Sequence, residues 1–430
     1  MSGTTDQLIA RRKKALGPAY EHFYERPLHL VRGEDVWVYD EAGKRYLDCY
    51  NNVPSVGHCN PYVLEALNRQ AGLLNTHTRY LHHEVIEYAE MIAATLPGDL
   101  SVCTFVCTGT EANDLAYRIA STVTGNDGVV VTSGAYHGNS TLVDQMSLEF
   151  GRDHVPPDFI VGIESPYTYR GSIGSDHPNP EAAYAELTDQ AIDTLASRGK
   201  KPAMLIIDSS FDARGILTPA PEYQQSVYQK VRAASGLVVA DEVQSGLCRL
   251  GDHYWGFEDS DVIPDIVTMG KPMGDGHPVA VVVTTPEIAA EFAAKSDYFN
   301  TFGGNPVSAA VGKAVLEVVE RDNLLGNVHS TSKYLLEGLH KLTQEFDLIG
   351  EVRGKGFFLG IELVTDRNSK EPATTQAAWI TEYMRESGVL ISKIGDYRNI
   401  LKIRPPLVFR PEHADIVLQK LRDALTTLNN

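Results

Sequence analysis

The chain has 430 residues, of which 43% are hydrophobic and 22% charged, and its formal net charge is −18. A chain of this length exceeds the size at which one hydrophobic core keeps growing, so we expect two packed domains. The negative charge argues against nucleic acid or an anionic membrane as a partner, because phosphate-rich surfaces select basic faces.

The pattern of the amino-terminal residues does not suggest secretion. Residues 1–14 are polar and lack an apolar core, and no apolar run reaches the ~18–20 residues that span a bilayer. Five cysteines without a CxxC pair are typical of a reduced, cytosolic protein. Cys103 and Cys107 lie in an apolar segment and are expected to be core rather than a metal site. We expect a soluble, cytoplasmic protein without a bound metal.

The first predicted element is a β-hairpin within residues 28–50, where apolar and polar residues alternate around a turn at 41–44. From about residue 60 to residue 320, apolar β-rich runs then alternate with helical periods; the runs are TFVC, GVVVTS, AMLIID, GLVVAD, DIVTMG and VAVVVTT. Strands that are almost continuously hydrophobic and separated by helices are typical of a mostly parallel sheet with helices on both faces.

The carboxyl-terminal part has a different pattern. A helical stretch at about 306–346 is followed by GFFLGIELV, a helix at about 374–386, VLISKI, LKIRPPLVF and a last helix from Pro411. This mixture predicts a second, smaller α+β domain, to which the amino-terminal hairpin returns. We therefore predict an α/β protein in which residues 60–325 form a large domain, residues 326–430 a small domain, and residues 1–59 pack with the small domain.

Polar residues cluster where the predicted strands end, and in an open α/β sheet ligands bind at the carboxyl ends of the strands. TFVC runs into Thr108, Gly109 and Thr110 at the start of a helical period. A glycine that lets the backbone approach, with hydroxyls and amides at a helix amino terminus, makes a cradle suited to a phosphate. Taken alone, a simple helix cap is the more common explanation of this pattern.

Two further strands end in charged residues. GLVVA leads into Asp241, which must be buried or nearly so and therefore needs a partner. A magnesium-holding acid of a nucleotide hydrolase would require a GxxxxGK[ST] loop, which the sequence lacks, so a protonated pyridine nitrogen is the better partner. DIVTMG leads into Lys271, whose apolar, glycine-rich surroundings would lower its pKa and free its amine for a Schiff base. By itself Lys271 would be interpreted as a surface-loop lysine.

Tyr136 follows the strand GVVVTS and could stack on a planar cofactor, although a packing role is equally common for such a tyrosine. Together these features supply a phosphate cradle, a ring platform, a carboxylate for a ring nitrogen and an amine for an aldehyde. These are the requirements of pyridoxal phosphate. Their occurrence in order, each at a strand end, predicts a site for that cofactor.

Over essentially its whole length the chain resembles the class III aminotransferases, which are fold-type I pyridoxal-phosphate enzymes. The matching stretches are VRGEDVWVYDEAGKRYLD, VGHCNP, CTGTEAND, AYHG, ADEVQSG, MGKPMGDGHPVA, TFGGNP, RGKGFFLGIEL and LKIRPPL. The resemblance implies that Lys271 carries the cofactor, that Asp241 pairs with its ring nitrogen, and that Tyr136 and Val243 cover the two ring faces. It further implies that Gln244 binds the phenolic oxygen and that Thr108, Gly109 and Thr110 hold the phosphate. Thr301 would reach the phosphate of a partner subunit, so the resemblance also implies a homodimer with shared active sites.

The departures from the family pattern concern the substrate. Family transaminases grip the substrate carboxylate with an arginine in a segment that reads RF-x-PP, where this chain has Lys402, Ile403 and Arg404. The usual EP-x-QG segment reads DSSFD at residues 208–212, and Arg79 adds a cation in NTHTRYLHH. A lysine acts as a point charge that suits phosphate equally well. We therefore expect Arg79, Lys402 and Arg404 to bind a phosphorylated amine, with Arg214 as a further candidate. These stretches resemble the ethanolamine-phosphate phospho-lyase branch of the family.

The resemblance therefore predicts a lyase that eliminates phosphate and ammonia from ethanolamine phosphate and leaves acetaldehyde. A transaminase of the ω-amino acid or alanine–glyoxylate type, which would use a keto-acid acceptor, is the alternative that the shared scaffold keeps open. An isomerising relative such as a racemase is a third. Phosphohydroxylysine and aminophosphonates remain open as substrates.

Overall fold

The computed structural model of the protein describes residues 5–149 and 155–429. The chain begins with helix α1 (Thr5–Leu16) and strands β1 (Leu30–Glu34), β2 (Trp37–Asp40) and β3 (Arg45–Asp48). β2 and β3 pair antiparallel, as the sequence predicted, and β1 pairs antiparallel with β2. β3 also pairs in parallel with β14 (Val389–Leu390), so a carboxyl-terminal strand completes this small sheet.

The central seven-stranded sheet has the strand order β4-β10-β9-β8-β7-β5-β6. Its strands are β4 (Val102–Val106), β5 (Gly128–Thr132), β6 (Ile160–Ile163), β7 (Pro202–Asp208), β8 (Leu237–Asp241), β9 (Ile266–Met269) and β10 (Ala280–Thr284). The predicted parallel sheet is present, but β10 runs antiparallel to both of its neighbours. This direction could not be predicted from the sequence, because a buried strand is apolar in either orientation.

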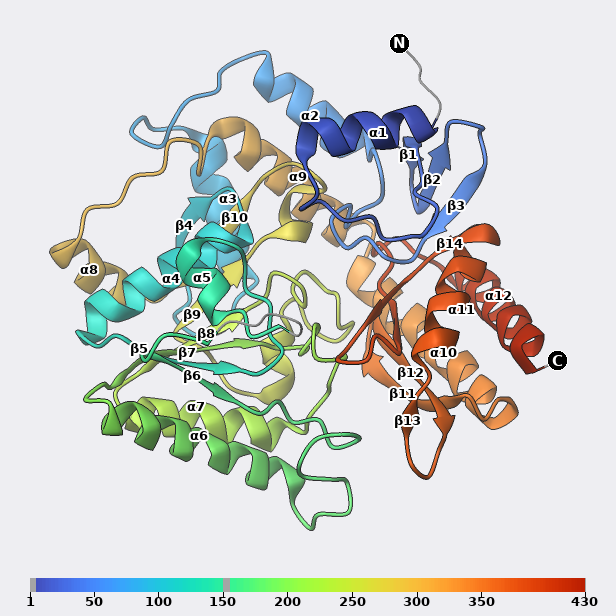
Figure 1. The fold of residues 1–430 in the computed structure, drawn as a ribbon. Coiled ribbons are helices and arrows are strands. Elements are labelled where there is room, and N and C mark those ends of the chain that lie inside the picture. The colour runs from blue at the N-terminus through green and yellow to red at the C-terminus, as the bar shows by residue number, and fades with distance from the viewer. Residues whose placement is uncertain (1–4, 150–154, 430) are drawn as a thin grey trace.

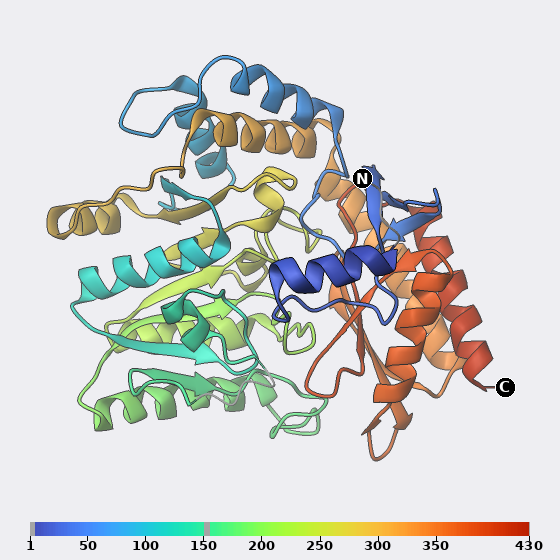
Figure 2. The ribbon, with the colours of Figure 1, turned by 45° about the horizontal axis from the view of Figure 1, so that its top comes forward.

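Helices cover both faces of this sheet (Figures 1 and 2). The helices of this region are α2 (Pro61–Ala71), α3 (His83–Ala94), α4 (Gly109–Thr124), α5 (Thr141–Met146), α6 (Pro180–Ser197), α7 (Pro221–Ala233), α8 (Pro286–Lys295) and α9 (Pro306–Arg321). Alternate residues of one strand pack into different cores: Val129 and Val131 of β5 pack with α4, whereas Val130 packs with α6 and α7. This alternation follows from the period of two in a pleated strand.

The carboxyl-terminal residues form a five-stranded sheet of β11 (Ile349–Lys355), β12 (Phe358–Asp366), β13 (Glu371–Pro372), β15 (Ser392–Ile394) and β16 (Ile400–Ile403). Helices α10 (Leu324–Glu345), α11 (Thr374–Glu386) and α12 (Pro411–Asn429) accompany it. The predicted helical stretch at 306–346 is two helices, because Asn323 between α9 and α10 adopts a left-handed conformation with φ 46°. On this arrangement we propose the domain division 1–59, 60–325 and 326–430.

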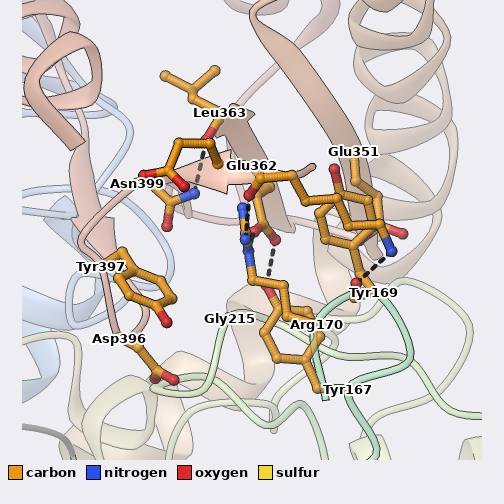
Figure 3. Close-up of polar contacts among 12 residues, drawn as sticks. Tyr167, Tyr169, Arg170, Gly215, Glu351, Glu362, Leu363, Asp396, Tyr397 and Asn399 are labelled. Atoms are coloured by element: carbon orange, nitrogen blue, oxygen red, sulfur yellow. Dashed lines mark hydrogen bonds and ion pairs between the residues drawn. The ribbon is translucent and has the colours of Figure 1, made fainter. Parts of the chain in front are cut away.

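A buried polar cluster joins the loop after β6 to this second sheet (Figure 3). Glu362 of β12 accepts hydrogen bonds from Tyr167 and from Arg170 of that loop, and its carboxylate also lies 2.7 Å from Arg353 of β11. Glu362 is fully buried, and burial by itself raises the pKa of its carboxyl. The ion pairs with Arg353 and Arg170 outweigh this effect and hold the pKa below its usual value. The cluster fixes the small sheet against the edge of the large one.

Candidate active site

Two adjoining cavities open beside the carboxyl ends of strands β7 and β8. The smaller, about 180 Å³, is lined by Gly109, Thr110, Tyr136, His137, Gly138, Asp208, Asp241, Val243, Gln244 and Lys271. The larger, about 330 Å³, shares Tyr136, Gln244 and Lys271 with it and extends to the small sheet and the amino-terminal segment. Apart from Thr108 and Thr301, every residue that the sequence predicted to bind the cofactor therefore lines the smaller cavity.

The amino terminus of α4 forms one wall of the smaller cavity. The side chain of Thr108 caps the helix, since its Oγ1 accepts a hydrogen bond of 3.1 Å from the amide of Glu111. A Cβ on Gly109 would lie 2.9 Å from the methyl groups of Val243, and one on Gly138, at φ 146°, would lie 2.5 Å from the hydroxyl of Thr110. Both glycines thus allow a close approach of backbones around a helix amino terminus, as a phosphate cradle requires.

Asp241 is held by a buried hydrogen-bond network that the sequence did not predict. Its Oδ2 accepts from the Asn113 amide at 2.8 Å and lies 2.7 Å from the His137 Nδ1, while its Oδ1 accepts from the amide of Val243 at 3.1 Å. Asn113 in turn accepts from Thr268 at 2.6 Å. Asn113 and His137 stood within the family-like stretches CTGTEAND and AYHG, but no spacing rule identified them as partners of Asp241.

Lys271 lies at the junction of the two cavities, on a short helical turn after β9. Burial, reinforced by the nearby guanidinium of Arg404, lowers the pKa of its amine. Asp208, at the end of β7 beside Asp241, has its pKa raised to about 6 by burial and by the neighbouring carboxylates. Asp208 was missed, although an acid directly after an apolar strand is the same signal that identified Asp241.

Gln244 and Arg404 hold each other in place. Gln244 Oε1 accepts from Asn52 at 2.9 Å and from Arg404, which leaves the Gln244 amide nitrogen as a donor toward the cavity. Arg404 is buried and also donates to the backbone oxygen of Tyr50 at 3.1 Å. Its guanidinium thus binds the amino-terminal segment to the site.

Lys402 is buried in the wall of the larger cavity and already has a counter-ion. Its Nζ lies 2.5 Å from Asp212 Oδ1, and Arg404 lies 3.8 Å from the other oxygen of Asp212. Burial, reinforced by Arg404, lowers the pKa of Lys402 to about 8. Asp212, the last residue of the divergent DSSFD segment, is the counter-ion that the sequence analysis did not identify.

Arg79 and Thr301 lie elsewhere. Neither lines the two cavities. The guanidinium of Arg79 stacks 4.1 Å above the ring of Phe299, and Thr301 is exposed two residues further along the same segment. A Cβ on Gly304 would touch Thr78, so the two predicted residues lie on one surface formed by adjoining segments.

The residues of the smaller cavity fit pyridoxal phosphate. A buried carboxylate at Asp241 suits a protonated ring nitrogen, the donor on Gln244 suits a phenolic oxygen, and the glycine-lined start of α4 suits a phosphate. An amine of lowered pKa at Lys271 suits an aldehyde.

No group of three or more His, Cys, Asp or Glu residues in the described part of the chain could hold a metal ion. No helix described here is long and apolar enough to cross a membrane.

Comparison with known proteins agrees with this geometry. A family model described as "Aminotransferase class-III" matches residues 19–425. An alanine–glyoxylate aminotransferase 2-like protein of Drosophila melanogaster is 42% identical over 98% of this chain and 87% of its own length. An ethanolamine-phosphate phospho-lyase homolog of Caenorhabditis elegans is 35% identical, covering 99% and 94%. The solved structure of a phospholyase from Arthrobacter in complex with phosphoethanolamine has a TM-score of 0.94 at 42% identity, covering 98% of this chain and 99% of that one.

Proposed function

Because the chain belongs to the class III aminotransferase family, whose cofactor is pyridoxal phosphate, we propose that it is a phospho-lyase rather than a transaminase. Its substrate is ethanolamine phosphate, which it converts with water into acetaldehyde, ammonia and inorganic phosphate. The same scaffold serves proteins named for both activities, so the assignment depends on the substrate side of the cavity.

The ion pair between Lys402 and Asp212 carries this proposal. In the family pattern that the sequence resembles, an arginine stands at the position of Lys402, and an arginine can hold a substrate carboxylate by two parallel hydrogen bonds. A lysine cannot form that fork, and at 2.5 Å from a buried aspartate its charge is largely neutralised. A substrate carboxylate would therefore lack the two-point contact that the arginine provides.

The residues of the site supply the steps of an elimination. Bound at Lys271, pyridoxal phosphate would accept the electrons released when the carbon next to the substrate nitrogen loses its proton. The Lys271 amine, freed when the substrate amine takes its place on the cofactor, would be the base that removes this proton. Asn113 and His137 orient the Asp241 carboxylate, which would stay beside the ring nitrogen of a bound cofactor. The neighbouring carbon–oxygen bond would then break and phosphate would leave with the electron pair of that bond. Hydrolysis by water would release the two carbons as acetaldehyde and the nitrogen as ammonia.

Positive charge around the larger cavity stabilises the departing phosphate. We propose that Lys402 and Arg404 contribute positive charge from the cavity wall, although the negative charge of Asp212 offsets part of it. The family resemblance implies that Thr301 reaches the site of a partner subunit. Because Arg79 lies on the same surface as Thr301, we propose that Arg79 also acts at the partner's site. We accordingly propose a homodimer with shared sites, located in the cytoplasm.

An alanine–glyoxylate type transaminase is the second candidate, and the 42% identity to a relative of that name supports it. Such an enzyme needs a keto acid to regenerate its cofactor form, whereas a lyase does not.

The deciding experiment is turnover of ethanolamine phosphate without any keto acid. We expect continuous release of phosphate and acetaldehyde in equal amounts, far beyond one equivalent per site. If the purified holoenzyme releases no phosphate but transfers the amine of alanine or ethanolamine phosphate to a keto acid, the lyase assignment is wrong while the family and cofactor stand.

A further inference from the structure

We infer that Arg398 and Ser392, on the hairpin formed by β15 and β16, hold the phosphate of the substrate. This inference rests on the proposed function and names the residues that the sequence did not predict for it. Both residues line the larger cavity, together with Lys271 at its base.

The cations predicted earlier have other partners. Lys402 is paired with Asp212, and Arg404 binds Gln244 and the backbone of Tyr50. The guanidinium of Arg398, in contrast, makes no hydrogen bond or ion pair within residues 5–149 and 155–429. Glu149, which also borders the cavity, is near enough for Arg398 to oppose the rise in its pKa that burial causes. A fork of five donors at a cavity wall is suited to a phosphate dianion.

Ser392 provides an independent sign of an absent ligand. It is 7% exposed, and its hydroxyl has no hydrogen-bond partner in the described structure. A buried hydroxyl without a partner is costly, so it is expected to meet a ligand. Ser392 pairs with Lys402 across the hairpin, which puts both side chains on the same face of the sheet, the face toward Asp212.

The turn that carries Arg398 is fixed at several points. Arg214 of the large domain donates to both oxygens of Asp396 at 2.8 Å, and the hydroxyl of Thr374 donates to the backbone oxygen of Tyr397 at 2.7 Å. On the other side Asn399 donates to the backbone oxygen of Leu363 at 2.7 Å (Figure 3). Arg398 itself adopts φ 53° between these anchors. Because the turn is anchored, its backbone does not have to be ordered when a phosphate binds, which lowers the entropy lost on binding.

Lys393 also borders the cavity, but it pairs with Leu401 and so its side chain lies on the face opposite to Ser392. This neighbour provides a charge-matched comparison: it changes the local charge by the same amount without removing the proposed contact.

The test compares Arg398→Gln, Ser392→Ala and Lys393→Gln with the wild-type holoenzyme. Arg398→Gln should lower kcat/KM for ethanolamine phosphate by about tenfold to a hundredfold, and Ser392→Ala by about threefold to tenfold. Arg398→Lys should recover only part of the loss because it keeps the charge but not the fork. Lys393→Gln should lose less than about threefold, since it removes only a screened charge. The visible absorption of the bound cofactor should be unchanged in all four variants.

Calorimetric titration of each holoenzyme with inorganic phosphate gives a readout that does not require turnover. Wild-type protein and Lys393→Gln should bind phosphate, and Arg398→Gln should bind it at least about tenfold more weakly. If Arg398→Gln binds phosphate like wild type, or if Lys393→Gln loses as much as Arg398→Gln, the assignment is overturned. Should wild type bind phosphate through Arg398 yet release none from ethanolamine phosphate, the subsite stands and the lyase function fails.

Discussion

At the scale of single residues, the chemistry of this site depends on which charged side chains have a hydrogen-bond or ion-pair partner and which do not. Asp241 is fixed by an amide and an imidazole, whereas Lys402 is paired with Asp212 in the wall of the larger cavity. Lys271 has no ion pair in the described structure, and burial lowers the pKa of its amine. An amine without a counter-ion is the one available for covalent chemistry.

We expect the purified protein to absorb in the visible through a cofactor bound to Lys271. Borohydride should fix this chromophore, and peptide mapping should place it on Lys271. Lys271→Ala should abolish the fixed label and lower kcat by at least about a hundredfold to ten-thousandfold, the range for loss of a positioned base. A label mapped to any other lysine would contradict the assignment.

Lys402 predicts a pH dependence. Its pKa is about 8, so its charge is present below that pH and lost above it. We expect kcat/KM for the phosphorylated amine to fall as pH rises through about 8, and this limb to be absent in Lys402→Arg, because arginine stays protonated. Since the pKa is lower in the folded than in the unfolded chain, this group adds to the free energy of unfolding as pH rises above about 8. A pH profile unaltered by Lys402→Arg would exclude Lys402 as its source.

At the scale of elements, the site lies where α4 begins and where the loop after β5 passes against it. Gly138 in that loop would meet Thr110 if it carried a Cβ, so the two segments approach as closely as backbones allow. The proposed cofactor cradle therefore depends on how these two segments pack, beyond the composition of either.

Gly138→Ala should weaken cofactor binding by about tenfold or more, because a left-handed backbone costs about 1–2 kcal/mol and the overlap with Thr110 about 1–3 kcal/mol more. The matched control is Gly125→Ala at the other end of α4, where φ is 71° and no atom lies within 4 Å of the added Cβ. Titration of the apoenzyme with cofactor measures both. Equal losses in the two variants would mean that backbone strain, and not the close approach, is responsible.

At the scale of the whole molecule, three parts of the chain meet at one cavity. Phe23 and Tyr50 come from the amino-terminal segment, Lys271 from the central sheet and Lys402 from the small sheet. Arg404 links the first and last of these, and the buried cluster around Glu362 links the small sheet to the large one. The position of the cations relative to Lys271 therefore depends on interdomain contacts.

Removing one partner of the buried cluster should be costly. Glu362→Gln leaves Arg353 and Arg170 without their fully buried counter-ion, and we expect a loss of about 3–5 kcal/mol in the free energy of unfolding. Glu351→Gln also removes a partner of Arg353, at 2.5 Å, but Glu351 is 33% exposed, so we expect less than about 1 kcal/mol. Denaturant titration checks both; similar losses would argue against a special role for Glu362.

Assembly is the last whole-molecule prediction. Phe302 is 70% exposed beside Thr301, on a surface with a cavity of about 750 Å³ lined by residues that include Phe299 and Ile86. We expect sedimentation to show a dimer, and Phe302→Asp to yield a monomer that holds cofactor poorly. Leu16→Asp, at an exposed leucine on α1, should leave the dimer intact. A monomeric wild type with full cofactor occupancy would contradict the shared-site proposal.

The sequence by itself determined the sheet and most of the predicted residues that line the smaller cavity, because burial and strand-end position leave a local record. Apolar runs located strands such as β8 and β9, and the charged residues at their carboxyl ends marked Asp241 and Lys271. Helix α11 was predicted at its observed ends, and the hairpin of β2 and β3 around its turn, for the same reason: periodicity and turn residues are local.

Only the tertiary structure decided which charges are neutralised. Lys402 and Asp212 are far apart in sequence, and a pairing of that kind leaves no periodic trace, so the sequence predicted a free cation where the fold gives an ion pair. The same holds for His137 and Asn113 at Asp241 and for the direction of β10. It also holds for Arg398, whose turn is anchored by contacts with Arg214 and Leu363. Composition and periodicity report the burial of a residue, whereas the identity of its partner depends on packing between distant segments.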